Sequence, residues 1–185
     1  MVSDFKIKET ADVNIEGGFI INGFPSTGLT SAIATELMIN TSRFEFAATI
    51  DSDRFPPISI IKNGAPNYPT RIFVNNDLKT AIFSSYVILD VSLHKDTAKM
   101  ILKWAAEKKC STIISSIAVK TKTDSIMGVA STGTARGKLV SAGIKTVDNG
   151  AVPGIPGVLL NEGVTNGQDV IVLLVGSESN APDLR

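Results

Sequence analysis

The loop from Gly23 to Thr30 is the segment best suited to bind an anion. It reads G-F-P-S-T-G-L-T between an apolar run and a helical pattern, which is the spacing of a phosphate-binding loop. That motif needs a lysine before its final threonine to reach the β- and γ-phosphates, and Leu29 stands there instead. Pro25 also removes a backbone amide that could face a phosphate, so a structural turn is the favoured interpretation. A helix N-terminus still permits anion binding, and the candidate residues for it are Gly23, Ser26, Thr27 and Gly28.

Two further glycine clusters follow in the second half of the chain. Ser131–Gly137 could bind an anion through Arg136, but a solvated turn that caps the next helix is the favoured interpretation. Gly150–Gly157 contains apolar Val152 and Ile155 among turn residues. It is either an exposed binding loop or a turn whose apolar residues complete the core, and the sequence leaves both open.

No set of residues with catalytic or metal-binding spacing is present. His94 and Cys110 are the only histidine and cysteine, whereas a zinc site uses several such ligands. The chain has no G-x-S-x-G nucleophile motif, and its acidic residues show no paired spacing. We expect His94 on the surface or at a helix start and Cys110 buried. We predict no catalytic residue, no metal and no cofactor.

The composition argues against several classes of protein. The 185 residues include 18 basic and 18 acidic side chains, so a concentrated positive field for nucleic acid is not expected. A single cysteine excludes an intrachain disulfide. The N-terminus lacks the order of a secretory signal, and no run of about 18 apolar residues is present. We expect one cytoplasmic domain over residues 1–185, with neither a membrane nor a nucleic acid as partner.

Hydrophobic periodicity predicts an alternation of strands and helices. The clearest helix is Lys95–Lys109, whose apolar stripe repeats at i, i+3, i+4 and i+7. Tyr86–Leu93 is compatible with a strand or with the approach to that helix. The other expected helices are Thr27–Asn40 and Thr134–Ala142. The expected strands are Phe5–Lys8, Phe19–Gly23, Phe44–Ile50, Pro57–Lys62, Thr70–Asn75, Leu78–Ser84, Thr112–Val119 and Val170–Val175.

Several motifs, taken in order, resemble those of the proteasome assembly chaperone family, including its archaeal members. An apolar strand leads into G-F-P-x-x-G-L at Gly23–Leu29 and then into a helix rich in small residues. Next come F-P-P at Phe55–Pro57, a strand after Pro69, and the helix that holds Trp104. The segments Gly128–Ser131 and Gly154–Leu160 also fit, so the likeness extends over residues 18–183.

The resemblance implies a three-layer αβα fold with a mixed, mainly parallel central sheet, related to phosphorylase/hydrolase-like folds without their active sites. It also implies a non-catalytic chaperone or scaffold that associates with itself and binds proteasome α-subunits or related clients. The alternatives are a small-molecule or nucleotide-dependent enzyme, an ATP-grasp-like ligase or hydrolase, that uses the Gly23–Thr30 turn, and an oligomeric structural protein without a client. The candidate protein-contact residues are Phe24, Pro25 and Ile155.

The sequence departs from the family at its end. Some archaeal members finish in a hydrophobic-Tyr-any tripeptide that docks on the α-ring, and the family commonly continues into C-terminal helices. This sequence ends Asp183-Leu184-Arg185, and its two tyrosines are Tyr68 and Tyr86. The expectation is that either a further segment follows or this member lacks the docking tail.

Overall fold

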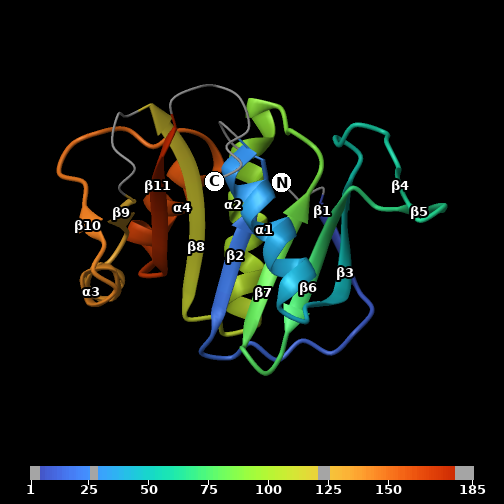
Figure 1. Ribbon diagram of the computed structural model, residues 1–185, viewed down its shortest axis with the longest axis horizontal. Helices are drawn as coiled ribbons and strands as arrows, with labels where there is room; N and C mark the ends of the chain where they lie inside the picture. The colour runs from blue at the N-terminus through green and yellow to red at the C-terminus, as the bar shows by residue number, and fades with distance from the viewer. Residues whose placement is uncertain (1–4, 26–28, 121–125, 178–185) are drawn as a thin grey trace.

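A single nine-stranded sheet organises the molecule, in the strand order β1-β3-β6-β7-β2-β8-β11-β9-β10 (Figure 1). The computed structural model describes residues 5–25, 29–120 and 126–177. The strands of this sheet are β1 (Phe5–Glu9), β2 (Phe19–Gly23), β3 (Glu45–Ser52), β6 (Thr70–Asn75), β7 (Thr80–Ser85), β8 (Thr112–Lys120), β9 (Met127–Ala130), β10 (Lys145–Thr146) and β11 (Asp169–Ser177). A separate hairpin pairs β4 (Ile60–Lys62) with β5 (Ala65–Asn67). The helices are α1 (Thr30–Thr41), α2 (His94–Glu107), α3 (Gly133–Ser141), α4 (Gly154–Asn166) and a short 3-10 helix, η2 (Val91–Leu93).

The centre of the sheet is parallel. β7, β2, β8 and β11 all run in one direction, with Ile20 opposite Ile113 and Ile113 opposite Val170. Such strands are covered on both faces and therefore consist largely of branched apolar residues. Antiparallel strands extend the sheet at both sides, through β6, β3 and β1 and through β9. This mixed sheet with a parallel centre confirms the predicted α/β fold.

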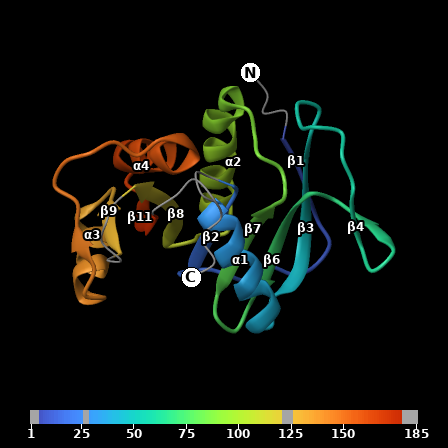
Figure 2. The same cartoon turned by 45° about the horizontal axis from the view of Figure 1, so that its top comes forward.

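The helices form the two outer layers. Ile20 and Ile113 belong to the same core as Trp104 of α2 and Leu159 of α4, so α2 and α4 cover one face. Ile171 follows Val170 in β11, so its side chain points to the opposite face of the sheet. There it packs with Leu139 of α3. Figure 2 shows α2 and α4 together on one side of the sheet and α1 on the opposite side. The arrangement is the expected three-layer αβα sandwich.

The core between α2, α4 and the sheet is aromatic at its centre. Phe83 of β7 meets Trp104 edge-on, with ring centroids 5.2 Å apart. Ala98, Ile101 and Ala105 of α2 are all fully buried, as the periodicity of that helix predicts. Among the described helices, none is long and apolar enough to cross a membrane.

Of the two alternatives for Tyr86–Leu93, the structure has the approach to the helix: the segment ends in η2, immediately before α2. Several other elements differ from those the sequence predicts. Strands β5, β9 and β10 and helix α4 were not predicted. β5 lies between the expected strands Pro57–Lys62 and Thr70–Asn75, and its Pro66 faces Ile61 of β4 in a two-stranded hairpin. A proline is tolerated there because the hairpin has only edge strands.

Candidate functional site

An apolar depression lies where β2 and β8 end. Its volume is about 260 Å³. Parts of the chain that are far apart in sequence form its walls: the turn after β2, the start of α2 and the start of α4. Ligand sites of open α/β sheets lie at this carboxyl edge of the strands. The lining residues are Phe24, Pro25, Val91, His94, Ile117, Pro153, Gly154, Ile155 and Pro156.

The structure therefore brings together the three residues predicted as protein contacts. Phe24 is only 1% exposed and belongs to the core, so it supplies the floor of the depression. Ile155 is 4% exposed and likewise faces inward, while Pro25 is half-buried. Only Pro25 among the three offers much surface to a partner.

A buried amide fixes the turn after β2. The Asn22 side chain donates through Nδ2 to Ser115 Oγ at 2.9 Å, and its Oδ1 accepts from the Phe24 amide at 3.2 Å. Asn22 is 1% exposed, and a buried amide without these partners would be costly. Asn22 thus ties the floor residue Phe24 to β8, which is why the turn holds its position.

Two glycines shape the wall that the start of α4 contributes to the depression. Gly154 has φ +73°, and a Cβ there would lie 3.7 Å from His94 Nδ1. A Cβ at Gly157 would lie 2.0 Å from the Val152 carbonyl oxygen, far inside van der Waals contact. The left-handed φ favours glycine at position 154, and the missing side chain of Gly157 lets α4 approach the preceding chain at Val152. Of the two readings left open for Gly150–Gly157, the structure places Ile155 in the core.

Two titratable side chains near the start of α2, His94 and Asp90, have hydrogen-bond partners within the protein. His94 begins α2, as expected, and its Nε2 lies 3.3 Å from the Leu89 carbonyl oxygen. The Asp90 carboxylate caps η2 by accepting from the Ser92 amide at 2.9 Å, and hydrogen bonds from Ser92 hold the pKa of Asp90 below its usual range. Across the part of the chain that the structure describes, no cluster of three metal-ligating side chains occurs.

Val91 lines the depression on the α2 side and belongs to a segment with exposed apolar side chains. Val91 is 77% exposed and Ile88 is 71% exposed, whereas the alternating residues Val87 and Leu89 are buried. This alternation turns every second apolar side chain of the segment toward solvent. The mostly apolar character of Tyr86–Leu93 was visible in the sequence, but the choice between a strand and the approach to a helix was open, so the residues that face outward could not be predicted.

The predicted anion-binding turns have structural roles where they are described. A Cβ at Gly23 would lie 2.4 Å from Thr35 Oγ1, so glycine there allows α1 to approach β2 closely. Ser26, Thr27 and Gly28 lie outside the described residues. In the second cluster, Thr132 caps α3 by accepting from the Ala135 amide at 3.0 Å, as predicted.

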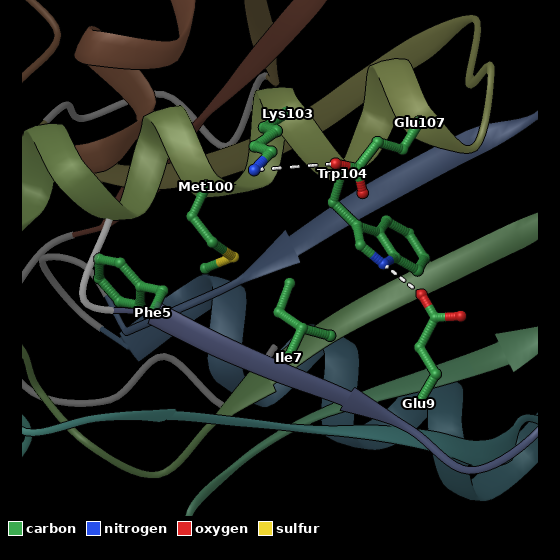
Figure 3. A pocket seen from close by; sticks show the side chains of 7 residues that line it. All are labelled: Phe5, Ile7, Glu9, Met100, Lys103, Trp104 and Glu107. Atoms are coloured by element: carbon green, nitrogen blue, oxygen red, sulfur yellow. Dashed lines mark hydrogen bonds and ion pairs between the residues drawn. The ribbon is translucent and has the colours of Figure 1, made fainter. Parts of the chain in front are cut away.

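A larger depression of about 420 Å³ separates β1 from α2 (Figure 3). Charged side chains line much of it, and they have partners within the protein. Lys103 pairs with Glu107 at 3.9 Å, and Glu9 accepts from Trp104 Nε1 at 2.9 Å and from Lys108 Nζ at 2.8 Å. These contacts hold β1 to α2, so we assign this groove a structural role.

Comparison with known proteins places the chain in a family. A model of the PAC2 family matches residues 20–185, and the chain belongs to that family. An uncharacterized protein of Methanocaldococcus jannaschii is 28% identical over 186 residues, which cover 100% of this chain and 77% of that protein.

Solved structures of similar proteins share the whole fold. PbaA of Pyrococcus furiosus, an archaeal homolog of proteasome-assembly chaperone, superposes with a TM-score of 0.86 at 25% identity, over 97% of this chain and 80% of PbaA. PbaB of the same organism, an archaeal proteasome activator, gives a TM-score of 0.79 at 19% identity, over 98% of this chain and 84% of PbaB. The resemblance to the proteasome assembly chaperones is thereby confirmed.

Proposed function

We propose that this protein is a non-catalytic chaperone or scaffold that binds other proteins at the depression formed by β2, α2 and α4. Its clients are proteasome α-subunits or related proteins, and it acts in the cytoplasm as a homo-oligomer. Membership of the PAC2 family and the similarity to PbaA support a role of this class.

One observation supports the proposal that partner proteins bind at this surface. A buried apolar floor, made of Phe24 and Ile155, lies beside Val91, which is 77% exposed. Exposed apolar side chains around an apolar hollow are typical of protein-binding sites, in which an apolar side chain of the partner enters the hollow. The volume of the depression, about 260 Å³, suits one inserted side chain.

The proposal is tested by light scattering coupled to size-exclusion chromatography, with the protein alone and mixed with proteasome α-subunits. We expect a stoichiometric complex with the wild type. Val91→Asp should weaken the complex by about tenfold or more, because a carboxylate would be desolvated in the contact. Val164→Asp is the matched control, because Val164 is 66% exposed at the far end of α4.

Two results would count against this function. Equal binding by wild type and Val91→Asp would remove the depression from the contact. Absence of any complex with α-subunits, together with calorimetric binding of ATP, would favour the enzyme alternative based on the Gly23–Thr30 turn.

A further inference from the structure

His94 has the one polar side chain among the described residues that line the depression at β2, α2 and α4. The other lining residues are apolar or, at Gly154, have no side chain. None of the described lining residues has a permanent charge. In an apolar pocket, a single well-placed polar group fixes the orientation of what enters and so provides specificity. His94 is therefore the residue to examine for the selectivity of this site.

The hydrogen bond of His94 determines which of its ring nitrogens is free. Nε2 lies 3.3 Å from the Leu89 carbonyl oxygen. A carbonyl oxygen only accepts, so in the neutral imidazole Nε2 has the proton and Nδ1 has the lone pair. Within the part of the chain that the structure describes, no group donates to Nδ1. His94 thus has one hydrogen-bond acceptor left for a group from outside the protein.

This acceptor faces the wall that α4 contributes. A Cβ at Gly154 would lie 3.7 Å from His94 Nδ1 and 3.8 Å from Cε1, so this edge of the imidazole ring is turned toward Gly154. Both residues line the depression, and the missing side chain of Gly154 leaves the space beside Nδ1 free. His94 is half-buried, so a hydrogen bond to Nδ1 would be partly shielded from water and thereby strengthened.

The chemistry of the depression restricts what can enter it. A charged side chain would lose its hydration without meeting an opposite charge. A purely apolar side chain would bury the Nδ1 lone pair without a donor, which is also costly. The volume of about 260 Å³ lies below the roughly 300–1,000 Å³ of pockets that enclose a small molecule. The best match is a single side chain with an apolar body and a hydroxyl at its tip, which describes tyrosine.

We propose that the client residue that enters this depression is a tyrosine and that His94 selects it. The phenol ring would pack on Phe24 and Ile155, and its hydroxyl would donate to His94 Nδ1. The inference rests on the proposed function, because it names the residue that a client presents to the same site. His94 acts here through one hydrogen bond and takes part in no reaction.

Amino-acid analogues test this selectivity without any client. The probes are N-acetyl-L-tyrosinamide and N-acetyl-L-phenylalaninamide, which differ by one hydroxyl group. We expect the tyrosine analogue to bind about fivefold more tightly, as one additional neutral hydrogen bond would allow. Nuclear magnetic resonance titration of the isotopically labelled protein, at about pH 8 so that imidazole groups are neutral, measures both affinities. The amide signals of Val91, Gly154 and Ile155 should shift, because these residues line the depression.

Two substitutions of His94 separate the roles of its ring nitrogens. Asparagine brings an amide oxygen close to the position of Nδ1, whereas the longer glutamine reaches the position of Nε2 and can keep the bond to Leu89. His94→Gln should therefore bind the two analogues equally, and His94→Asn should retain the preference for the tyrosine analogue. Circular dichroism and thermal unfolding verify that both variants are folded.

Three results would overturn the inference. The first is equal binding of the two analogues by the wild type, and the second is a tyrosine preference that persists in His94→Gln. The third is that neither analogue binds to the wild type at about 20 mM, a concentration that detects even millimolar affinities. Binding of α-subunits by Val91→Asp, measured in parallel, tests the proposed function separately. If that variant loses the client while the wild type does not distinguish the analogues, only the assignment of tyrosine fails.

Discussion

Trp104 of α2 donates its indole N–H to the Glu9 carboxylate of β1 at 2.9 Å, across 95 residues of sequence. Lys108 adds a second hydrogen bond to the same carboxylate at 2.8 Å, and its ammonium lies 5.7 Å from the centre of the Trp104 ring. Since β1 pairs with only β3 in the sheet, Glu9 is the group that fastens this edge strand to the helical layer.

Removing that carboxylate should destabilise the protein measurably. In Glu9→Ala the indole N–H of Trp104, a residue only 2% exposed, loses its partner, which costs about 1–3 kcal/mol. Glu16→Ala is the matched control, because its ion pair with Lys109 at 3.3 Å is solvent-exposed and is worth about 0–1 kcal/mol. Urea unfolding followed by the fluorescence of Trp104 measures both. Equal midpoints for the two variants would contradict this role of Glu9.

Because of Asp169, the stability of the folded protein should decrease as the pH falls into the acid range. Partial burial raises its pKa, but hydrogen bonds from Thr132 and Lys138 outweigh burial and leave the pKa below the ordinary value of 3.8. A depressed folded-state pKa contributes stability above the unfolded value, and this contribution is lost as the pH falls through the folded value. Asp169→Asn should therefore lower the melting temperature at neutral pH, and the difference from wild type should shrink below pH 3.8. A difference in melting temperature that stays constant between pH 7 and pH 2 would rule out this role of Asp169. Asp148→Asn serves as the control, because Asp148 is exposed.

Two glycines should respond oppositely to alanine. At Gly157 a Cβ would lie 2.0 Å from the Val152 carbonyl oxygen, so Gly157→Ala should displace the start of α4 and destabilise the fold by about 1–3 kcal/mol. At Gly137, within α3, a Cβ has nothing within 4 Å, so Gly137→Ala should stabilise by about 0.5–1 kcal/mol. Thermal unfolding compares them. A stabilising Gly157→Ala would mean that this contact is not rigid.

Cys110 should be inert in the native protein. Its side chain is buried, its Sγ lies 3.3 Å from the Thr112 carbonyl oxygen, and burial raises the pKa of the thiol. Because the thiolate is the reactive form, modification by a thiol reagent at pH 8 should follow the rate of unfolding. Rapid modification that is independent of urea concentration would show that Cys110 is accessible in the folded state.

The sequence predicted those elements whose pattern is local. The stripe of α2 and the apolar runs of β2 and β8 were found because their periodicity depends on burial alone. Helix α4 was missed because it begins at Gly154 with Pro156 and Gly157 in its first turn, residues that usually indicate a loop. Its helical conformation depends on packing against α2, which no local pattern reveals.

The candidate site, too, was predicted only in part from the sequence. Phe24, Pro25 and Ile155 were selected as residues of loops, and the structure brings them to one depression. Their burial could not be predicted, because the sheet order that unites β2 with β8 is a property of the whole chain. Val91 and Ile88 were missed since their exposure follows from the path of one segment between β7 and α2.

The central place of β2 has a consequence for synthesis of the protein. β2 lies between β7 and β8, and Thr112, which begins β8, leaves the ribosome long after Phe19. Before β7 (Thr80–Ser85) is made, Ile20, fully buried in the finished protein, has neither neighbouring strand, and between Ser85 and Thr112 it has a neighbour on one side only. In that interval the nascent chain carries an open, apolar sheet edge, which makes it a client for the general chaperones of the cell.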